Sequence, residues 1–145
     1  LCYDLFHLKK GPPPRIALNI ELKNGKAGKC LIDKNLIDSC HDVSSGGIIL
    51  CLLEMSIASN IGVNLKTNKK AMDRVKYLFG EDQSWYIVEV SEQNKQNFEN
   101  YIKDIDIFFK NIWKTSEKIL IDDDLKFDLK ELSEINKQWF YKYNN

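Results

Sequence analysis

The sequence lacks an excess of charge of either sign. Its 145 residues include 21 Lys and Arg against 21 Asp and Glu, and only Arg15 and Arg74 are arginines. Phosphate backbones and anionic lipid surfaces are bound by clustered positive charge. The balance therefore predicts that the chain binds neither nucleic acid nor a membrane.

Long apolar runs are also missing. The longest one, residues 48–53, is interrupted by Glu54, whereas a membrane helix needs about 20 apolar residues. The start shows no signal-peptide pattern of a charged segment, an apolar block and a cleavage site. With 43% hydrophobic and 11% aromatic residues, the composition nevertheless argues against disorder, and the length is that of one domain.

Common catalytic and metal motifs are absent. None of Cys2, Cys30, Cys40 and Cys51 forms a C-x-x-C motif, so structural zinc is not expected and the thiols are predicted to be reduced. The sequence contains no phosphate-binding P-loop, no G-x-S-x-G and no H-E-x-x-H. Adjacent residues on a strand point to opposite faces, so Cys40 and His41 do not make a nucleophile–base pair.

The hydrophobic pattern predicts a mixture of helices and strands. We expect helices at residues 1–10, 16–37, 48–58, 69–79, from a Ser91 cap onward, and 129–143. We expect strands at residues 38–43, 61–65, 84–90, 106–113 and 118–121, with a turn at residues 122–124. Gly11-Pro12-Pro13-Pro14 should form a rigid elbow, and Asn24-Gly25 with Gly28 should make the second helix irregular. The order predicts a single α+β domain over residues 1–145, with helices layered on a mixed or antiparallel sheet.

The most informative segment reads His-Asp-Val-Ser-Ser-Gly-Gly at residues 41–47. A strand should deliver Asp42 to its end, and the following helix start offers unpaired N–H groups and a positive dipole end that suit phosphate. Gly46 and Gly47 would allow close approach of a ligand. Asp42 is a hard oxygen ligand for Mg²⁺, and Ser44 can donate a hydrogen bond to phosphate.

A structural interpretation of the same segment is also open. Asp42 or Ser44 can simply cap the helix, while the glycines permit a turn. His41 ends a short apolar strand, and a structural role is favoured for it over a catalytic one.

Two further polar features allow alternative interpretations. Gly-Glu-Asp-Gln-Ser at residues 80–84 could aim Glu81 or Gln83 into a cleft, or could form a solvated turn. Glu54, alone in an apolar helix, could be a buried acid or could lie at the helix edge.

Several motifs occur in an order that resembles a known family. They are Gly-Pro-Pro-Pro at residues 11–14, Glu21 with Asn24-Gly25, residues 41–47, 53–55, 61–63 and 78–83, Ile112-x-x-Thr115, and Trp139-Phe140. This order resembles the C-terminal domain of phosphoribosylformylglycinamidine synthase, an amidotransferase of purine synthesis. The domain type is shared with aminoimidazole ribonucleotide synthetase and, more distantly, with selenophosphate synthetase and the hydrogenase maturation protein HypE.

The resemblance implies an AIR-synthase-type C-terminal domain of a cytoplasmic ATP-dependent ligase. That enzyme converts formylglycinamide ribonucleotide, ATP and glutamine-derived ammonia to the amidine, ADP and phosphate. The implied partners are the rest of the synthase subunit, separate glutaminase and small bridging subunits, and the small-molecule substrate. The catalytic residues of the family lie outside this domain, so the chain is expected to be a fragment that is inactive alone.

The resemblance also assigns site residues. The family subunit is a tandem duplication, and this domain faces an auxiliary site that holds ADP with magnesium. Carried over, Asp42 is the magnesium ligand, and Ser44, with His41, Gly46 and Gly47, binds the nucleotide. By internal pseudo-symmetry alone, Glu81 and Gln83 match positions that bind substrate in the other copy.

The sequence departs from the family pattern near this site. Ser45 replaces a usual acidic residue, Trp85 replaces a common arginine, and a glycine-rich I-G-x-T-G-G motif is Ile-Trp-Lys-Thr-Ser-Glu at residues 112–117. Trp113 cannot take up without strain the positive φ that glycine allows. Two alternatives therefore stay open: a scaffold domain with an inactive nucleotide site, and another enzyme of the superfamily such as a selenophosphate synthetase.

Overall fold

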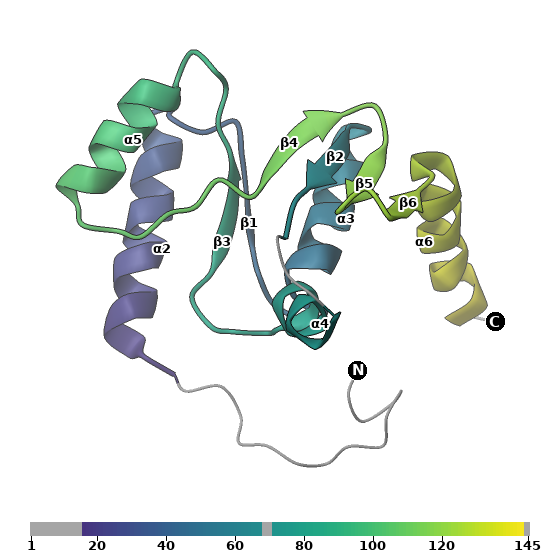
Figure 1. Ribbon diagram of the computed structural model, residues 1–145. Helices are drawn as coiled ribbons and strands as arrows, with labels where there is room; N and C mark the ends of the chain where they lie inside the picture. The colour runs from purple at the N-terminus through teal and green to yellow at the C-terminus, as the bar shows by residue number, and fades with distance from the viewer. Residues whose placement is uncertain (1–15, 68–70, 144–145) are drawn as a thin grey trace. The chain divides into compact units, whose positions relative to one another are not determined.

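The computed structural model describes residues 16–67 and 71–143 (Figure 1). The helix expected at residues 1–10 and the Gly-Pro-Pro-Pro elbow lie outside the described residues. The described residues fall into two compact units. The first contains residues up to 51 together with 78–110, and the second contains residues 52–77 together with 111–143.

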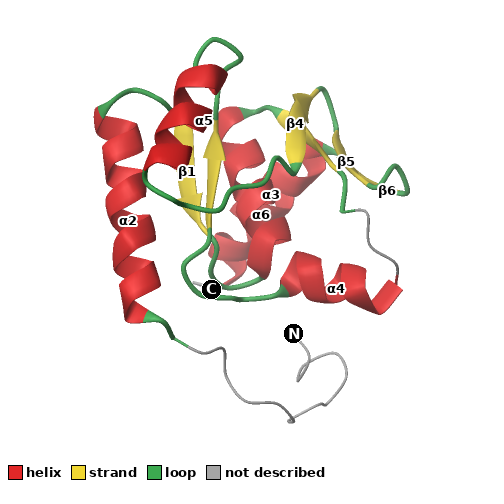
Figure 2. Cartoon of the chain, turned by 60° about the vertical axis from the view of Figure 1, so that its left-hand side comes forward, coloured by secondary structure: helices red, strands yellow, loops and turns green. Residues whose placement is uncertain are grey.

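The first unit is built on a pair of short antiparallel strands. β1 (Ser39–Asp42) pairs with β3 (Tyr86–Glu89), with Ser39 opposite Glu89 and Asp42 opposite Tyr86. The helices α2 (Leu18–Asp33) and α5 (Lys95–Asp104) lie beside this pair in both views (Figures 1 and 2). They enclose an apolar core formed by Leu31, Ile37, Phe98 and Ile102.

The helix α2 is continuous, so the irregularity expected around Asn24-Gly25 and Gly28 is wrong. Its inner face buries Ala27, Gly28 and Leu31. Tertiary packing of such a face stabilises a helix more than the intrinsic preference of a single glycine weakens it.

The second unit contains a four-stranded mixed sheet with the order β4-β2-β5-β6. Its strands are β2 (Gly62–Leu65), β4 (Trp113–Ser116), β5 (Ile119–Ile121) and β6 (Leu125–Phe127). β2 runs parallel to β5, and the other two pairings are antiparallel. The buried residues Leu65, Ile119 and Ile121 lie on the two central strands.

Three further helices complete the fold. α6 (Leu129–Tyr143) belongs to the second unit, while α3 (Gly47–Ser59) and α4 (Ala71–Phe79) each have residues in both units. Helices and mixed or antiparallel sheets together confirm the predicted α+β class. Within the described ranges no helix is long and apolar enough to span a bilayer.

Three further details differ from the prediction. Residues 106–112 are not a strand, because Ile107 N–H bonds back to the Ile102 carbonyl and Asp106 has a φ of 51°, which ends α5 in a turn. α5 begins at Lys95, beyond Ser91. β6 was not expected, because its three residues follow the acidic turn too closely for a hydrophobic pattern to emerge.

Candidate functional site

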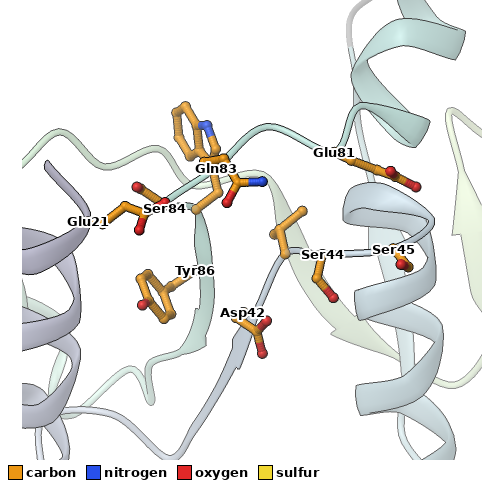
Figure 3. Close-up of a pocket in the computed structure, with 10 residues that line it drawn as sticks. Glu21, Asp42, Ser44, Ser45, Glu81, Gln83, Ser84 and Tyr86 are labelled. Atoms are coloured by element: carbon orange, nitrogen blue, oxygen red, sulfur yellow. The ribbon is translucent and has the colours of Figure 1, made fainter. Parts of the chain in front are cut away.

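A pocket of about 420 Å³ lies in the first unit, where the β1–α3 turn meets the loop from α4 to β3 (Figure 3). α2 supplies one further wall. The lining residues are Glu21, Asp42, Val43, Ser44, Ser45, Glu81, Gln83, Ser84, Trp85 and Tyr86.

Strand pairing places Asp42 in this pocket. Asp42 is the last residue of β1 and lies opposite Tyr86, the first residue of β3. Val43 beyond it is buried, while Ser44 and Ser45 are exposed. Figure 3 shows the exposed Asp42 carboxylate between Tyr86 and Ser44. The strand end thus presents a carboxylate beside a hydroxyl, as the sequence predicted.

The turn before α3 depends on two glycines with left-handed backbones. Gly46 has a φ of 81° and Gly47 a φ of 71°, and Gly47 N–H donates to the Ser44 carbonyl at 3.0 Å. A Cβ atom added at Gly47 would lie 2.6 Å from the Leu78 carbonyl oxygen and 2.8 Å from that of Gly80. Gly47 therefore lets the end of α4 approach the start of α3, which brings the following loop to the pocket.

A side chain from that loop bonds directly to the turn. The Glu81 carboxylate accepts a hydrogen bond of 2.9 Å from the Gly46 N–H. Negative charge at a helix start is favoured by the helix dipole and the unpaired N–H groups. The segments at residues 41–47 and 80–84, which the sequence singled out, are thus joined by a hydrogen bond.

The same loop is held from two other sides. Asn24 Nδ2 on α2 donates to the Ser84 carbonyl at 2.9 Å, and Val43 N–H donates to the Trp85 carbonyl at 2.9 Å. Ser84 has a φ of 69°, an uncommon conformation for a residue with a side chain. The Trp85 ring meets Phe108 edge to face, with 6.2 Å between ring centroids. These contacts fix the wall that carries Gln83 and Trp85.

The pocket is electronegative. Glu21, Asp42 and Glu81 line it, and no Lys, Arg or His lines it over residues 16–67 and 71–143. Trp85 occupies the position where the resemblance would place an arginine. A site of this sign attracts a cation or a cation-bound phosphate more than a bare anion.

The donor set fits magnesium only when the ligand completes the coordination. Over residues 16–67 and 71–143, no three His, Cys, Asp or Glu side chains form a metal-binding group. Mg²⁺ usually takes one or two protein carboxylates and fills its other positions with water and phosphate oxygens. Asp42 can be such a single carboxylate.

The pocket brings together four of the seven predicted site residues: Asp42, Ser44, Glu81 and Gln83. The other three, His41, Gly46 and Gly47, are not among its lining residues. The His41 Nδ1 atom lies 2.7 Å from the Asp42 carbonyl oxygen, and Glu54 is exposed on α3.

Sequence reasoning did not assign the other lining residues to the site. Glu21 was part of the motif order but had no role there. Tyr86 lies in the pocket because it pairs with Asp42. A strand pairing cannot be predicted from either segment alone.

A family model described as "AIR synthase related protein, C-terminal domain" matches residues 14–121. The chain therefore belongs to this family.

Curated relatives are similar to the chain over nearly its whole length. The chain is 36% identical over 141 residues to phosphoribosylformylglycinamidine synthase subunit PurL of Pelagibacter ubique, covering 97% of this chain and 19% of that protein. It is 30% identical over 145 residues to the subunit of the same name from Bartonella bacilliformis, covering 97% and 19%. The chain thus spans about a fifth of the length of these relatives.

Solved structures agree on the fold. Thermotoga maritima PurL complexed with FGAR gives a TM-score of 0.65 at 16% identity, over 78% of this chain and 21% of that one. The structure of PurLQS from the same organism also gives 0.65, at 15% identity, over 91% and 24%. At these identities the likeness supports the fold alone.

Proposed function

We propose that this chain is the C-terminal domain of a phosphoribosylformylglycinamidine synthase subunit and contributes an auxiliary magnesium–nucleotide site. The observation that carries the proposal is that Asp42, at the end of β1, and Ser44, in the turn before α3, line one pocket with Glu81 and Gln83. The relatives named as that synthase support the enzyme assignment. Thermotoga maritima PurL complexed with ATP and with ADP supports a nucleotide as the ligand.

Each residue has a distinct role in this proposal. The Asp42 carboxylate would hold Mg²⁺, which neutralises phosphate charge when it is bound. The Ser44 hydroxyl would donate a hydrogen bond to a phosphate oxygen, and the dipole of α3 would favour negative charge beside it. Gln83 would offer an amide to the remainder of the ligand. His41, Gly46 and Gly47 would act by shaping the turn and the strand end.

The remaining parts of the proposal concern the complete enzyme. Its reaction would convert formylglycinamide ribonucleotide, ATP and glutamine to the amidine, ADP, phosphate and glutamate in the cytoplasm. The partners would be the rest of the subunit and separate glutaminase and bridging subunits, and the structure of PurLQS from Thermotoga maritima supports an assembly of this kind. The 145-residue chain alone would not make the amidine.

Binding of Mg·ADP tests the site. We would titrate it into the chain and into Asp42→Ala while following the unfolding temperature. A ligand at 100 times its dissociation constant stabilises the folded state by about 2.7 kcal/mol. The gain should appear in the unchanged chain and be absent from Asp42→Ala.

Asp38→Ala is the matched control. Asp38 is exposed immediately before β1 and is not a lining residue, so this variant should keep the full gain. The absence of any gain in the unchanged chain would contradict the proposed site.

A second candidate function is a scaffold domain whose nucleotide site is inactive. The bond from the Gly46 N–H to Glu81 favours it, because the proposed phosphate position is occupied by a carboxylate of the chain itself. A stable chain that shows no nucleotide-dependent gain would support this function.

A further inference from the structure

Glu81 occupies the hydrogen-bonding position that an incoming phosphate would use. Its carboxylate accepts the Gly46 N–H at 2.9 Å, at the start of a 13-residue helix. An internal carboxylate bonded there competes with any external anion for the same donor.

The backbone around Glu81 holds this contact in place. The Gly47 backbone abuts the carbonyl groups of Leu78 and Gly80, directly before Glu81. On the far side of Glu81, Asn24 holds the Ser84 carbonyl. The loop backbone is therefore held on both sides of Glu81, although the Glu81 side chain itself is exposed.

Two other carboxylates add to the repulsion of an anion. Glu21 and Asp42 line the same pocket, and none of the described residues that line it carries a positive charge. A metal-free phosphate must therefore break the Glu81–Gly46 bond and also enter a field of like charge. A divalent cation on Asp42 would offset this cost, because its positive charge attracts the phosphate.

We propose that Glu81 is a specificity-determining residue that excludes metal-free anions from the start of α3 and admits only phosphate bound to a divalent cation. This inference rests on the proposed nucleotide site and adds a selection rule to it. Its consequence is a site that stays empty of free phosphate and metal-free nucleotide and fills with the magnesium complex.

Metal-free pyrophosphate is the direct probe. We would measure its binding by calorimetry in EDTA, using the unchanged chain and Glu81→Gln, which keeps the shape of the side chain and removes its charge. A hydrogen bond to a charged group is stronger than one to a neutral group. Together with the lost repulsion, this predicts affinity for pyrophosphate at least about tenfold higher in Glu81→Gln.

Two matched controls distinguish the effect of the Glu81–Gly46 hydrogen bond from that of the negative charge of the pocket. Asp82→Asn removes the adjacent exposed carboxylate, which is not a lining residue, and should leave pyrophosphate binding unchanged. Glu21→Gln removes a lining carboxylate that has no bond to the turn and should increase affinity by less than about threefold. Equal gains in all three variants, or no gain in Glu81→Gln, would overturn the inference.

The same proteins distinguish this inference from the proposed function. With Mg·ADP, Glu81→Gln should gain less affinity than it gains for metal-free pyrophosphate, so the advantage given by magnesium should shrink. If Mg·ADP binds neither protein while Glu81→Gln gains pyrophosphate affinity, the nucleotide proposal fails and the role of Glu81 stands. If Mg·ADP binds and pyrophosphate affinity does not change, the nucleotide proposal stands and the role of Glu81 fails.

Discussion

Asn24 holds the carbonyl group of Ser84 through a side-chain hydrogen bond of 2.9 Å that joins α2 to the pocket loop. Ser84 has a φ of 69°, so its backbone depends on surrounding contacts. We expect Asn24→Ala to lower the free energy of unfolding by about 1 kcal/mol. Urea unfolding measures this change, and hydrogen exchange should show faster opening of residues 83–86.

Asn97→Ala is the matched control for that substitution. Asn97 is exposed within α5, so alanine there should change the free energy of unfolding only through its higher helix preference, by a few tenths of a kcal/mol. Asn24→Ala should be less stable than Asn97→Ala. Equal stability of the two variants would show that the bond to Ser84 contributes nothing.

Gly47 and Gly28 should respond in opposite directions to alanine. At Gly47 the new methyl group would lie 2.6 Å from a backbone oxygen at a φ of 71°, so we expect a loss of about 3 kcal/mol. At Gly28, within α2, an added Cβ meets nothing within 4 Å, so we expect a gain of about 0.5–1 kcal/mol. Thermal unfolding of the two variants checks both signs. A tolerated Gly47→Ala would show that α4 does not need this close approach.

Local patterns predicted most of the elements because each element carries its own signal. α3 could be predicted from an apolar run that follows two glycines. β3 could be predicted from a cluster of aromatic and β-branched residues. The start of α5 could not be found in this way, because the Asn94 side chain donates to the distant Asn35 carbonyl and Ser91 provides no cap. A contact across 59 residues leaves no local pattern.

The site was predictable only where its residues are neighbours in sequence. Asp42 and Ser44 follow from a strand that ends at a glycine turn. The bond between Glu81 and Gly46 joins residues 35 apart, and it exists because α4 approaches the backbone of Gly47. The electronegative character of the pocket likewise depends on Glu21, which reaches it from α2.

Asp122 should be far more important for stability than its neighbour Asp123. Asp122 accepts hydrogen bonds from the backbone N–H of Thr67, at 2.7 Å, and from its hydroxyl, and Thr67 is fully buried. Asp123 pairs with Lys66 at the surface. Unpaired buried donors cost about 1–3 kcal/mol, whereas an exposed ion pair contributes at most about 1 kcal/mol.

The two alanine variants make a matched pair for this prediction. Asp122 and Asp123 have φ values of 53° and 66°, so alanine meets similar backbone strain at both positions. We expect Asp122→Ala to be about 2 kcal/mol less stable than Asp123→Ala in urea unfolding. Equal losses would mean that the Thr67 groups find other partners.

The pH dependence of stability should include a contribution from Asp124. The hydrogen bond of 2.7 Å from the Arg74 guanidinium, aided by charge attraction, lowers the pKa of the Asp124 carboxyl in the folded chain. A carboxyl whose pKa is lower when folded stabilises the protein at a pH above its unfolded pKa of about 3.9. That contribution disappears as the pH falls through the lowered pKa, because the carboxyl is then protonated in both the folded and the unfolded state.

The stability difference between the unchanged chain and Asp124→Asn should therefore be constant above about pH 5 and shrink below about pH 4. Urea unfolding from pH 2 to pH 7 measures this stability difference. The control is Glu117→Gln, at an exposed turn. A difference that does not depend on pH would contradict the pairing of Asp124 with Arg74.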